Sequence, residues 1–313
     1  MLTNRRELLQ LLSVAGVTFA SGLRGAEAAT RGKREEDFLF LQISDLHWGY
    51  QGPANPEAAT VLPKVIDLVN ASGLEPDFVV FTGDLTHNTD DAAVRRRRLA
   101  EVKKLVGGLS CKKLCFLPGE HDAAADAGAA FKEAFGPSFS SFDHKGVHFV
   151  LLDNVSDRAG AVRPAQRDWL AADLAKVPKD RRVVVFTHRP LFDLAPSWEW
   201  ATQDGAAVLD ILMPHRNVTV FYGHIHQEHH QATEHILHHA ARSLVFALPA
   251  PMSQPKKAPL PFDPAQPLHG LGYRDVARRQ RPDGLVVSEH PLDGLGIAKA
   301  APAPASDPHD SGW

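Results

Sequence analysis

The chain has little of three things that often decide a protein's class: cysteine, long apolar runs and net charge. Two of its 313 residues are cysteines, and its formal net charge is -3. So small a charge gives no electrostatic case for binding nucleic acid or an anionic membrane surface. If Cys111 and Cys115 lie on one strand, they are about 13 Å apart, whereas a disulfide spans at most about 7 Å. We therefore expect two unpaired thiols in one large α/β domain with a substantial apolar core.

The longest mildly apolar stretch lies near the start, over residues 8–23. At about 16 residues it is shorter than the roughly 20 that a membrane-spanning helix needs. It follows the pair Arg5-Arg6 and precedes the small residues of 26–29. This order predicts a twin-arginine export signal over residues 1–29, with an anchor helix as the alternative. The expected partner is then the Tat export machinery, the expected location is the periplasm, and no membrane association follows cleavage.

Five apolar runs each end in a polar cluster, and this pattern is the main feature of the sequence. The run 218–222 precedes Gly223-His224-Ile225-His226, where we expect the glycine to take backbone angles that other residues avoid. The other clusters are Asp45-Leu46-His47, Gly83-Asp84, Gly119-Glu120-His121-Asp122 and Thr187-His188-Arg189. Ligands of open α/β sheets bind beyond the carboxyl ends of the strands. Five such ends carrying carboxylate or imidazole predict one shared site.

These motifs, in this order, resemble those of the calcineurin-like metallophosphoesterase superfamily over about residues 38–226. The resemblance implies an α/β fold, a four-layer αββα sandwich of two mixed sheets flanked by helices, over residues 37–292. Strands and helices that alternate through residue 222 support the first half of this fold independently. One position departs from the family pattern, which has asparagine where this chain has Glu120.

The resemblance also implies two metal ions, which would be Mn, Fe or Zn, with an Fe(III)–M(II) pair as an alternative. The residues implied as metal ligands are Asp45, His47, Asp84, Glu120, His188, His224 and His226. Asp84 would bridge the two ions, which makes it catalytic together with His121. His121 would lie beside the leaving group as a phosphate ligand or general acid, with an unidentified carboxylate nearby, such as Asp122. Arg189 could bind phosphate or pair with an acid.

The implied activity is hydrolysis of a small-molecule phosphate ester by attack of a metal-bound hydroxide. Phosphodiesters of the cyclic-nucleotide or glycerophosphodiester type are the favoured substrates. The alternatives are a phosphomonoesterase, such as an acid phosphatase or nucleotidase, and a metal-binding scaffold without activity. Because Glu120 adds a negative charge that asparagine lacks, we expect it to favour singly charged diesters over monoesters, or a trivalent ion.

The remaining segments give coarser predictions. Helices are expected over 57–71, 92–106, 127–135 and 163–176, and hairpins over 140–152 and 271–290. The run Arg95-Arg96-Arg97-Arg98 is interpreted as a solvated helix face. Residues 234–239 and 243–248 are expected to be successive strands of a second sheet, so that the histidines crowded near them cannot all converge. Residues 298–313 are expected to be a disordered tail.

Overall fold

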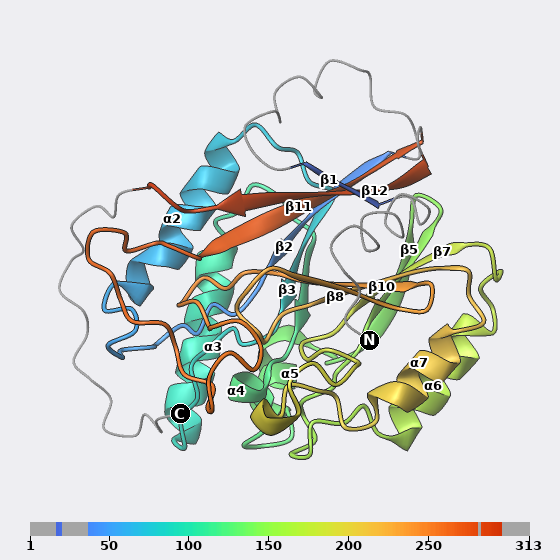
Figure 1. The fold of residues 1–313 in the computed structure, drawn as a ribbon, viewed down its shortest axis with the longest axis horizontal. Coiled ribbons are helices and arrows are strands. Elements are labelled where there is room, and N and C mark those ends of the chain that lie inside the picture. Colours follow the sequence, from blue (N-terminus) through green and yellow to red (C-terminus); the bar gives the residue numbers. More distant parts are fainter. Residues whose placement is uncertain (1–16, 21–36, 281–282, 296–313) are drawn as a thin grey trace.

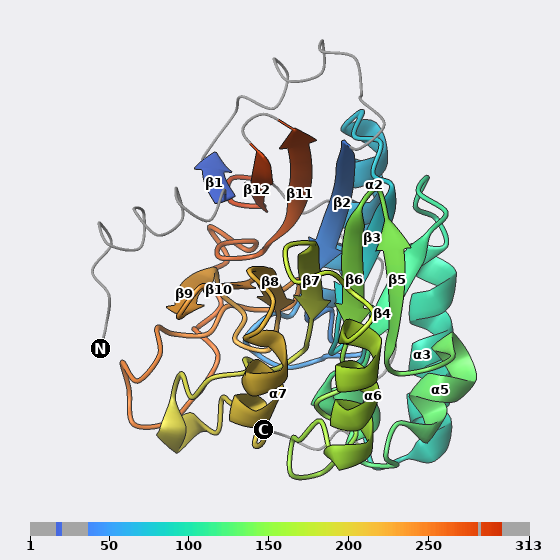
Figure 2. The same ribbon diagram turned by 90° about the vertical axis from the view of Figure 1, so that its right-hand side faces the viewer.

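Two mixed β-sheets lie face to face between two layers of helices (Figure 1). This computed structural model describes residues 17–20, 37–280 and 283–295. In Figure 1, α2 and α3 lie on one side of the pair of sheets and α6 and α7 on the other; Figure 2, turned by 90°, shows the strands side by side with α6 and α7 in front. The predicted αββα sandwich is therefore confirmed.

The first sheet has the strand order β1-β12-β11-β2-β3-β4. Its strands are β1 (Val17–Ala20), β2 (Phe38–Ile43), β3 (Phe78–Thr82), β4 (Leu114–Leu117), β11 (Gly272–Gln280) and β12 (Asp283–Pro291). Strands β2, β3 and β4 run parallel, whereas β11 pairs antiparallel with both β2 and β12. The outer face packs against α2 (Ala58–Ala71), α3 (Ala92–Val106) and α5 (Ala129–Phe135). The carboxyl ends of three neighbouring strands therefore meet at one edge.

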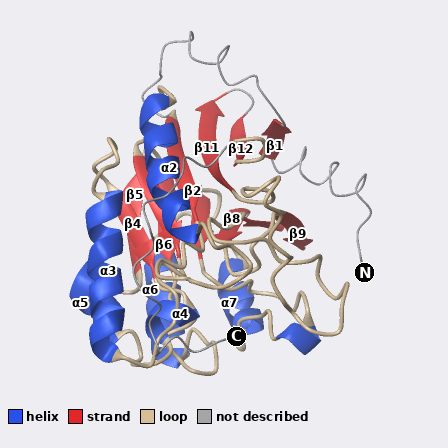
Figure 3. Ribbon diagram, turned by 90° about the vertical axis from the view of Figure 1, so that its left-hand side faces the viewer, coloured by secondary structure: helices blue, strands red, loops and turns tan. Residues whose placement is uncertain are grey.

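The second sheet has the order β5-β6-β7-β8-β10-β9. Its strands are β5 (Ser140–His144), β6 (Val147–Leu151), β7 (Arg182–Phe186), β8 (Asn217–Tyr222), β9 (His229–Thr233) and β10 (Ile236–Ala240). The four central strands are parallel, and β5 and β9 form antiparallel edges. The outer face packs against α6 (Pro164–Leu174) and α7 (Gly205–Leu212), which Figure 3 shows in blue. Strands β6 and β7 are buried along their whole length, which explains why they are apolar except for His148 and Arg182.

Phenylalanine rings fill the space between the sheets. The Phe40 ring meets the edges of Phe149, Phe186 and Phe221, with ring centroids 5.5–6.0 Å apart. Such edge-to-face pairs stabilise a core beyond the area they bury. This aromatic layer fixes the two sheets against each other and so fixes the distance between the loops at their ends.

The prediction of a strand over residues 243–248 is wrong. The chain leaves β10 at Ala240 and continues as a loop. The apolar side chains there are buried as expected, but the backbone bonds to other loops instead of to a strand. Leu244 N donates to Asp45 O, and Asn55 Nδ2 donates to Val245 O. The segment therefore supports the loops at the strand ends.

The histidines of β9 and β10 point to opposite faces of their sheet, as expected. His238 packs on Phe192, whereas His239 lies against Phe221 and 2.9 Å from the ring nitrogen of His230. Among the described residues, the groups that could hold a metal ion all lie elsewhere. The separation of these histidines is confirmed.

The first strand comes from the predicted export signal. Residues Val17–Ala20 pair parallel with β12 at the edge of the first sheet. The rest of the signal and the tail 298–313 lie outside the described residues, so export stays a prediction. None of the described helices combines the length and apolar character needed to cross a membrane.

Candidate metal centre

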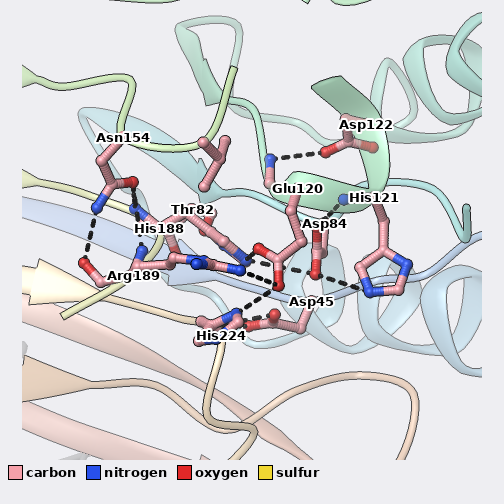
Figure 4. A network of polar contacts seen from close by, with 12 residues as sticks. Asp45, Thr82, Asp84, Glu120, His121, Asp122, Asn154, His188, Arg189 and His224 are labelled. Carbon is pink, nitrogen blue, oxygen red and sulfur yellow. Dashed lines mark hydrogen bonds and ion pairs between the residues drawn. The ribbon is translucent and has the colours of Figure 1, made fainter. Parts of the chain in front are cut away.

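All seven predicted metal ligands lie together where strands of both sheets end. Figure 4 labels Asp45, Asp84, Glu120, His188 and His224 among them. The loops after β2 and β3 supply three of them, the start of the short helix α4 (Glu120–Ala123) after β4 supplies Glu120, and the loops after β7 and β8 supply three. Six are at most 5% exposed, and the side chain of Glu120 is 20% exposed. They form two groups of candidate ligands, in each of which the ligand atoms lie within 4.8 Å of one another.

Five of these ligands have left-handed backbone angles that are unusual for residues other than glycine. Their φ values lie between 42° and 66°, for Asp45, His47, Asp84, His224 and His226. Hydrogen bonds between loops hold this conformation: Asp45 N donates to Gly83 O, and His47 N donates to Asp84 O. Such strain persists only where surrounding structure imposes it, and it concentrates at functional sites.

Gly223 does not take the positive φ expected from the sequence. It is needed for a different reason, because a Cβ atom there would lie 2.0 Å from Ser44 Oγ and 2.7 Å from Asp45 Oδ2. The glycine lets the loop after β8 approach the loop after β2. His224 N then donates to the Asp45 carboxylate at 3.0–3.1 Å.

The first group consists of Asp45, His47 and His226. His226 Nε2 lies 3.4 Å from Asp45 Oδ1 and 3.2 Å from His47 Nε2. The other nitrogen of His226, Nδ1, lies 3.0 Å from Phe246 O. A proton on Nδ1 leaves the lone pair of Nε2 directed into the group, as a metal ligand requires.

The second group consists of Asp84, Glu120, His188 and His224. Glu120 lies between the two histidines, with Oε2 2.9 Å from His188 Nε2 and Oε1 2.8 Å from His224 Nδ1. His188 Nδ1 lies 2.7 Å from Thr82 O, so Nε2 is again the nitrogen that faces the group. Glu120 thus points inward, as the predicted ligand must.

Asp84 connects the two groups. Its Oδ2 lies 3.4 Å from His47 Nε2 in the first group and 3.3 Å from His188 Nε2 in the second. Its Oδ1 accepts a hydrogen bond from His121 N at 2.9 Å. One carboxylate oxygen between two sets of ligands is the arrangement expected of a bridging residue.

The residues fit a pair of cations. Glu120 Oε2 and His188 Nε2 are buried but have no hydrogen-bond partner among the described residues, despite their close approach. Burial lowers the pKa of His188, but Asp84 and Glu120 outweigh it and raise that pKa well above its usual value. A proton at that nitrogen is stabilised by the same carboxylates that would stabilise a cation. Mixed carboxylate and imidazole donors suit Mn, Fe and Zn.

Two carboxylates of the site, those of Asp45 and Glu120, are held in their ionised form. Burial raises the pKa of Asp45, but the His226 ring outweighs it and brings the pKa below its usual value. Burial likewise raises the pKa of Glu120, and His224 and Arg189 lead the effects that bring it well below its usual value. Burial lowers the pKa of His224 to about 4. Ionised carboxylates beside a neutral imidazole are what a cation requires.

His121 lies at the border of the site, with its side chain 12% exposed. Its Nε2 is 3.7 Å from Asp84 Oδ2, and its Nδ1 faces the backbone N–H of Asn88 at 3.3 Å. The sequence left open which carboxylate accompanies His121, and the structure answers that it is Asp84. Asp122 points away and accepts hydrogen bonds from the backbone of Leu85 and Gly119.

Arg189 lies beside Glu120, with Nη2 3.5 Å from Oε1. All nine predicted site residues, the seven ligands with His121 and Arg189, are therefore brought together. Of the two roles that the sequence allowed for Arg189, the structure contains the pair with an acid.

Three residues that matter here were missed or misread from the sequence. Asn154 Oδ1 accepts from the backbone N–H of both His188 and Arg189. His87 Nδ1 lies 3.4 Å from His47 Nδ1, and only its position three residues after Asp84 could have suggested it. Arg98, assigned to a solvated face, is buried and donates to the backbone of the site loops. Arg95 is buried too, so the solvated interpretation of that run is wrong for these two members.

The sequence model of the family described as calcineurin-like phosphoesterase matches residues 38–228. A cAMP/cGMP dual-specificity phosphodiesterase of Mycobacterium tuberculosis is 29% identical over 202 residues, 61% of this chain and 62% of that protein. A probable cyclic nucleotide phosphodiesterase of Rhodococcus erythropolis is 28% identical over 206 residues, 62% of this chain and 66% of that protein. The chain thus aligns with just under two thirds of each relative's length.

A solved structure with the same fold is a dimetal phosphatase from Danio rerio, which superposes with a TM-score of 0.61. The superposition covers 81% of this chain and 96% of the other, at 15% sequence identity. At that identity the likeness concerns the fold.

Proposed function

Because the chain belongs to the calcineurin-like phosphoesterase family, we propose that it hydrolyses small-molecule phosphodiesters with the help of two metal ions. The observation that carries the dimetal part of this proposal is Asp84 Oδ2, between two groups of ligands. The preference for diesters is supported by the names of the two relatives, which are cyclic nucleotide phosphodiesterases. Cyclic nucleotides are therefore the first substrates to try, and glycerophosphodiesters the second.

We assign the ligands to two ions, which we propose are Mn, Fe or Zn. Asp45, His47 and His226 would hold one ion, the other ligand group would hold the second, and Asp84 would be shared. When bound, two such ions would neutralise the charge of the phosphoryl oxygens and lower the pKa of a bound water. The protein's part is to hold the imidazole lone pairs and carboxylates inward, through the carbonyls of Thr82 and Phe246 and the left-handed loop residues.

His121 is the residue that we propose contacts the leaving group. Its Nδ1 faces the N–H of Asn88, so the ring proton lies on Nε2, which is directed toward Asp84 and the centre. A proton at that atom can hydrogen-bond to a phosphate oxygen and to the departing oxygen, and so stabilise the negative charge that develops there. Replacing His121 should therefore slow substrates with poor leaving groups more than it slows nitrophenyl esters.

The test is the ratio of bis-p-nitrophenyl phosphate to p-nitrophenyl phosphate hydrolysis by the full chain loaded with Mn. A ratio well above one supports a phosphodiesterase, provided that Asp84→Ala abolishes hydrolysis of the diester and the control Asp168→Ala keeps it. Asp168 is exposed on α6, on the outer face of the second sheet. A ratio below one would identify a phosphomonoesterase, and bound Mn without hydrolysis of any ester would identify a scaffold.

We also propose that the protein is exported to the periplasm by the Tat machinery, on the basis of Arg5-Arg6 and the stretch that follows. Replacing both arginines with lysine should leave the protein in the cytoplasm of a bacterium that exports the unaltered chain. Export of the double-lysine variant at the normal level would contradict this assignment.

A further inference from the structure

We propose that Glu120 and Arg189 work as one charge-balanced unit, in which Arg189 positions Glu120 as a metal ligand and offsets its charge. This inference rests on the dimetal site of the proposed function. It makes Arg189 a positioning residue instead of a phosphate-binding one, and it accounts for a glutamate where the resembling family has a neutral asparagine.

The contacts of Glu120 leave one side of its carboxylate for the arginine. Oε2 faces His188 and Oε1 faces His224, at 2.9 Å and 2.8 Å from the ring nitrogens. The guanidinium of Arg189 approaches Oε1 at 3.5 Å (Figure 4). Glu120 therefore has an imidazole beside each oxygen and the Arg189 guanidinium beside Oε1, and these contacts direct its carboxylate to the position between the two histidines.

Arg189 itself is built into place. Asn154 accepts from Arg189 N and donates to Arg189 O, which fixes the backbone of the arginine next to ligand His188. The Arg189 side chain is 18% exposed and its Nη1 lies over Gly160, where an added Cβ atom would lie 2.5 Å away. Gly160 also has a φ of 68°. A guanidinium held in this way loses little conformational freedom when it pairs with Glu120.

The charges explain why a partner is needed. Two divalent ions bring four positive charges, which Asp45, Asp84 and Glu120 reduce to one, whereas a neutral residue at 120 would leave two. Arg189 restores the charge that Glu120 removes. The expectation that Glu120 alone makes the site unfavourable to doubly charged monoesters therefore changes, because selectivity should depend on both members of the pair.

The pair gives opposite predictions for its two single variants. Glu120→Asn leaves Arg189 without its carboxylate and adds a positive charge, so the diester-to-monoester rate ratio should fall. Arg189→Met leaves Glu120 uncompensated, so the ratio should rise. The double variant restores the balance and should return the ratio to within about twofold of the unaltered chain, because the two opposite changes in charge cancel.

Binding of Mn in the absence of substrate provides the readout independent of activity. The Kd of the weaker Mn site is measured for the unaltered chain, both single variants and the double variant. The change in this Kd in the double variant should differ by at least about threefold from the product of the changes in the two single variants. Arg96→Met is the matched control, since Arg96 on α3 forms an exposed pair with Glu133. It should change neither the Mn affinity nor the rate ratio.

The opposing results are distinct. If Arg189 binds phosphate directly, Arg189→Met should raise the inhibition constant of inorganic phosphate by the same factor whether residue 120 is Glu or Asn. The effects of the two substitutions on the Kd of Mn should then be additive. These two results together would overturn the inference. An inactive protein that binds two Mn ions with the expected coupling would support the pair while rejecting the proposed phosphodiesterase. Binding of fewer than two Mn ions by the unaltered chain would overturn both.

Discussion

Asp122 is the residue whose removal should most clearly weaken the support of the centre. It is fully buried, and its carboxylate accepts four hydrogen bonds: Oδ1 from Thr86 N and Thr86 Oγ1, and Oδ2 from Leu85 N and Gly119 N. These distances are all 2.8–2.9 Å. Asp122 thereby joins the loop that carries Asp84 to the loop that carries Glu120.

The substitution Asp122→Ala leaves four buried donors without an acceptor. At about 1–3 kcal/mol for each buried polar group left unsatisfied, even the lower limit gives a loss of about 4 kcal/mol in the free energy of unfolding. That is a large part of the roughly 5–15 kcal/mol that keeps a domain folded. Asp122→Asn keeps one acceptor oxygen but turns an NH₂ group toward two donors, so about half the loss is expected.

Urea unfolding with excess EDTA measures this loss without the stabilisation that bound metal adds. Asp204→Ala is the matched control, because Asp204 accepts from Val162 N and Arg163 N and pairs with Arg167, but its side chain is 16% exposed, so water can reach these partners. A loss below about 1 kcal/mol in Asp122→Ala, or a loss no greater than that of the control, would refute the reasoning. Weaker Mn binding by Asp122→Asn, measured separately, would show that the same bonds position the ligands.

Three further predictions follow from single side chains. His87→Leu removes the ring nitrogen 3.4 Å from His47 Nδ1 and should weaken Mn binding by about tenfold or more. His87→Asn keeps an acceptor and should recover part of the Mn affinity. Equal Mn affinities in the two variants would contradict a supporting role for His87. Burial, and then His229, lower the pKa of the His238 ring from 6.5 to about 3, so its contribution to stability is fully present above pH 6.5 and is lost as the pH falls toward 3. Denaturant unfolding without metal should show a loss of about 2 kcal/mol from this residue between pH 7 and pH 5, and His238→Leu should reduce the pH dependence by that amount; an unchanged dependence would disprove it. Burial raises the pKa of the Cys115 thiol to about 11, so at pH 8 only about one thiol in a thousand is ionised, and rapid modification of native protein by a thiol reagent would be inconsistent with it.

The ligands could be predicted from the sequence because each lies within four residues of the end of a strand. An apolar run fixes where a strand ends, and parallel neighbours bring those ends to one edge. Asp45, Asp84 and His188 therefore needed no knowledge of distant contacts. The family resemblance added the two metal ions, the assignment of the ligands to them and the sharing of Asp84 between the ions.

The supporting residues could not be predicted, because their partners are far away in the chain. Arg98 donates to the carbonyls of His87 and Gly49, from a helix whose sequence indicates only a charged face. Residues 243–248 have the apolar composition of a strand, but Phe246 O faces His226 Nδ1 instead of a neighbouring strand. In both cases tertiary hydrogen bonds override the local pattern.

The glycines of the motifs are needed for two different reasons, which the sequence pattern alone does not distinguish. Gly83 has a φ of 95°, so it does need angles that other residues avoid. Gly119 and Gly223 do not have positive φ values, yet a Cβ atom would lie 1.9 Å from Asp84 Oδ1 at the first and 2.0 Å from Ser44 Oγ at the second. These two glycines are required because loops from different strands touch there. It follows that the motifs form one unit: the glycines allow the loops to approach, and the ligand residues, not the glycines, take most of the backbone strain.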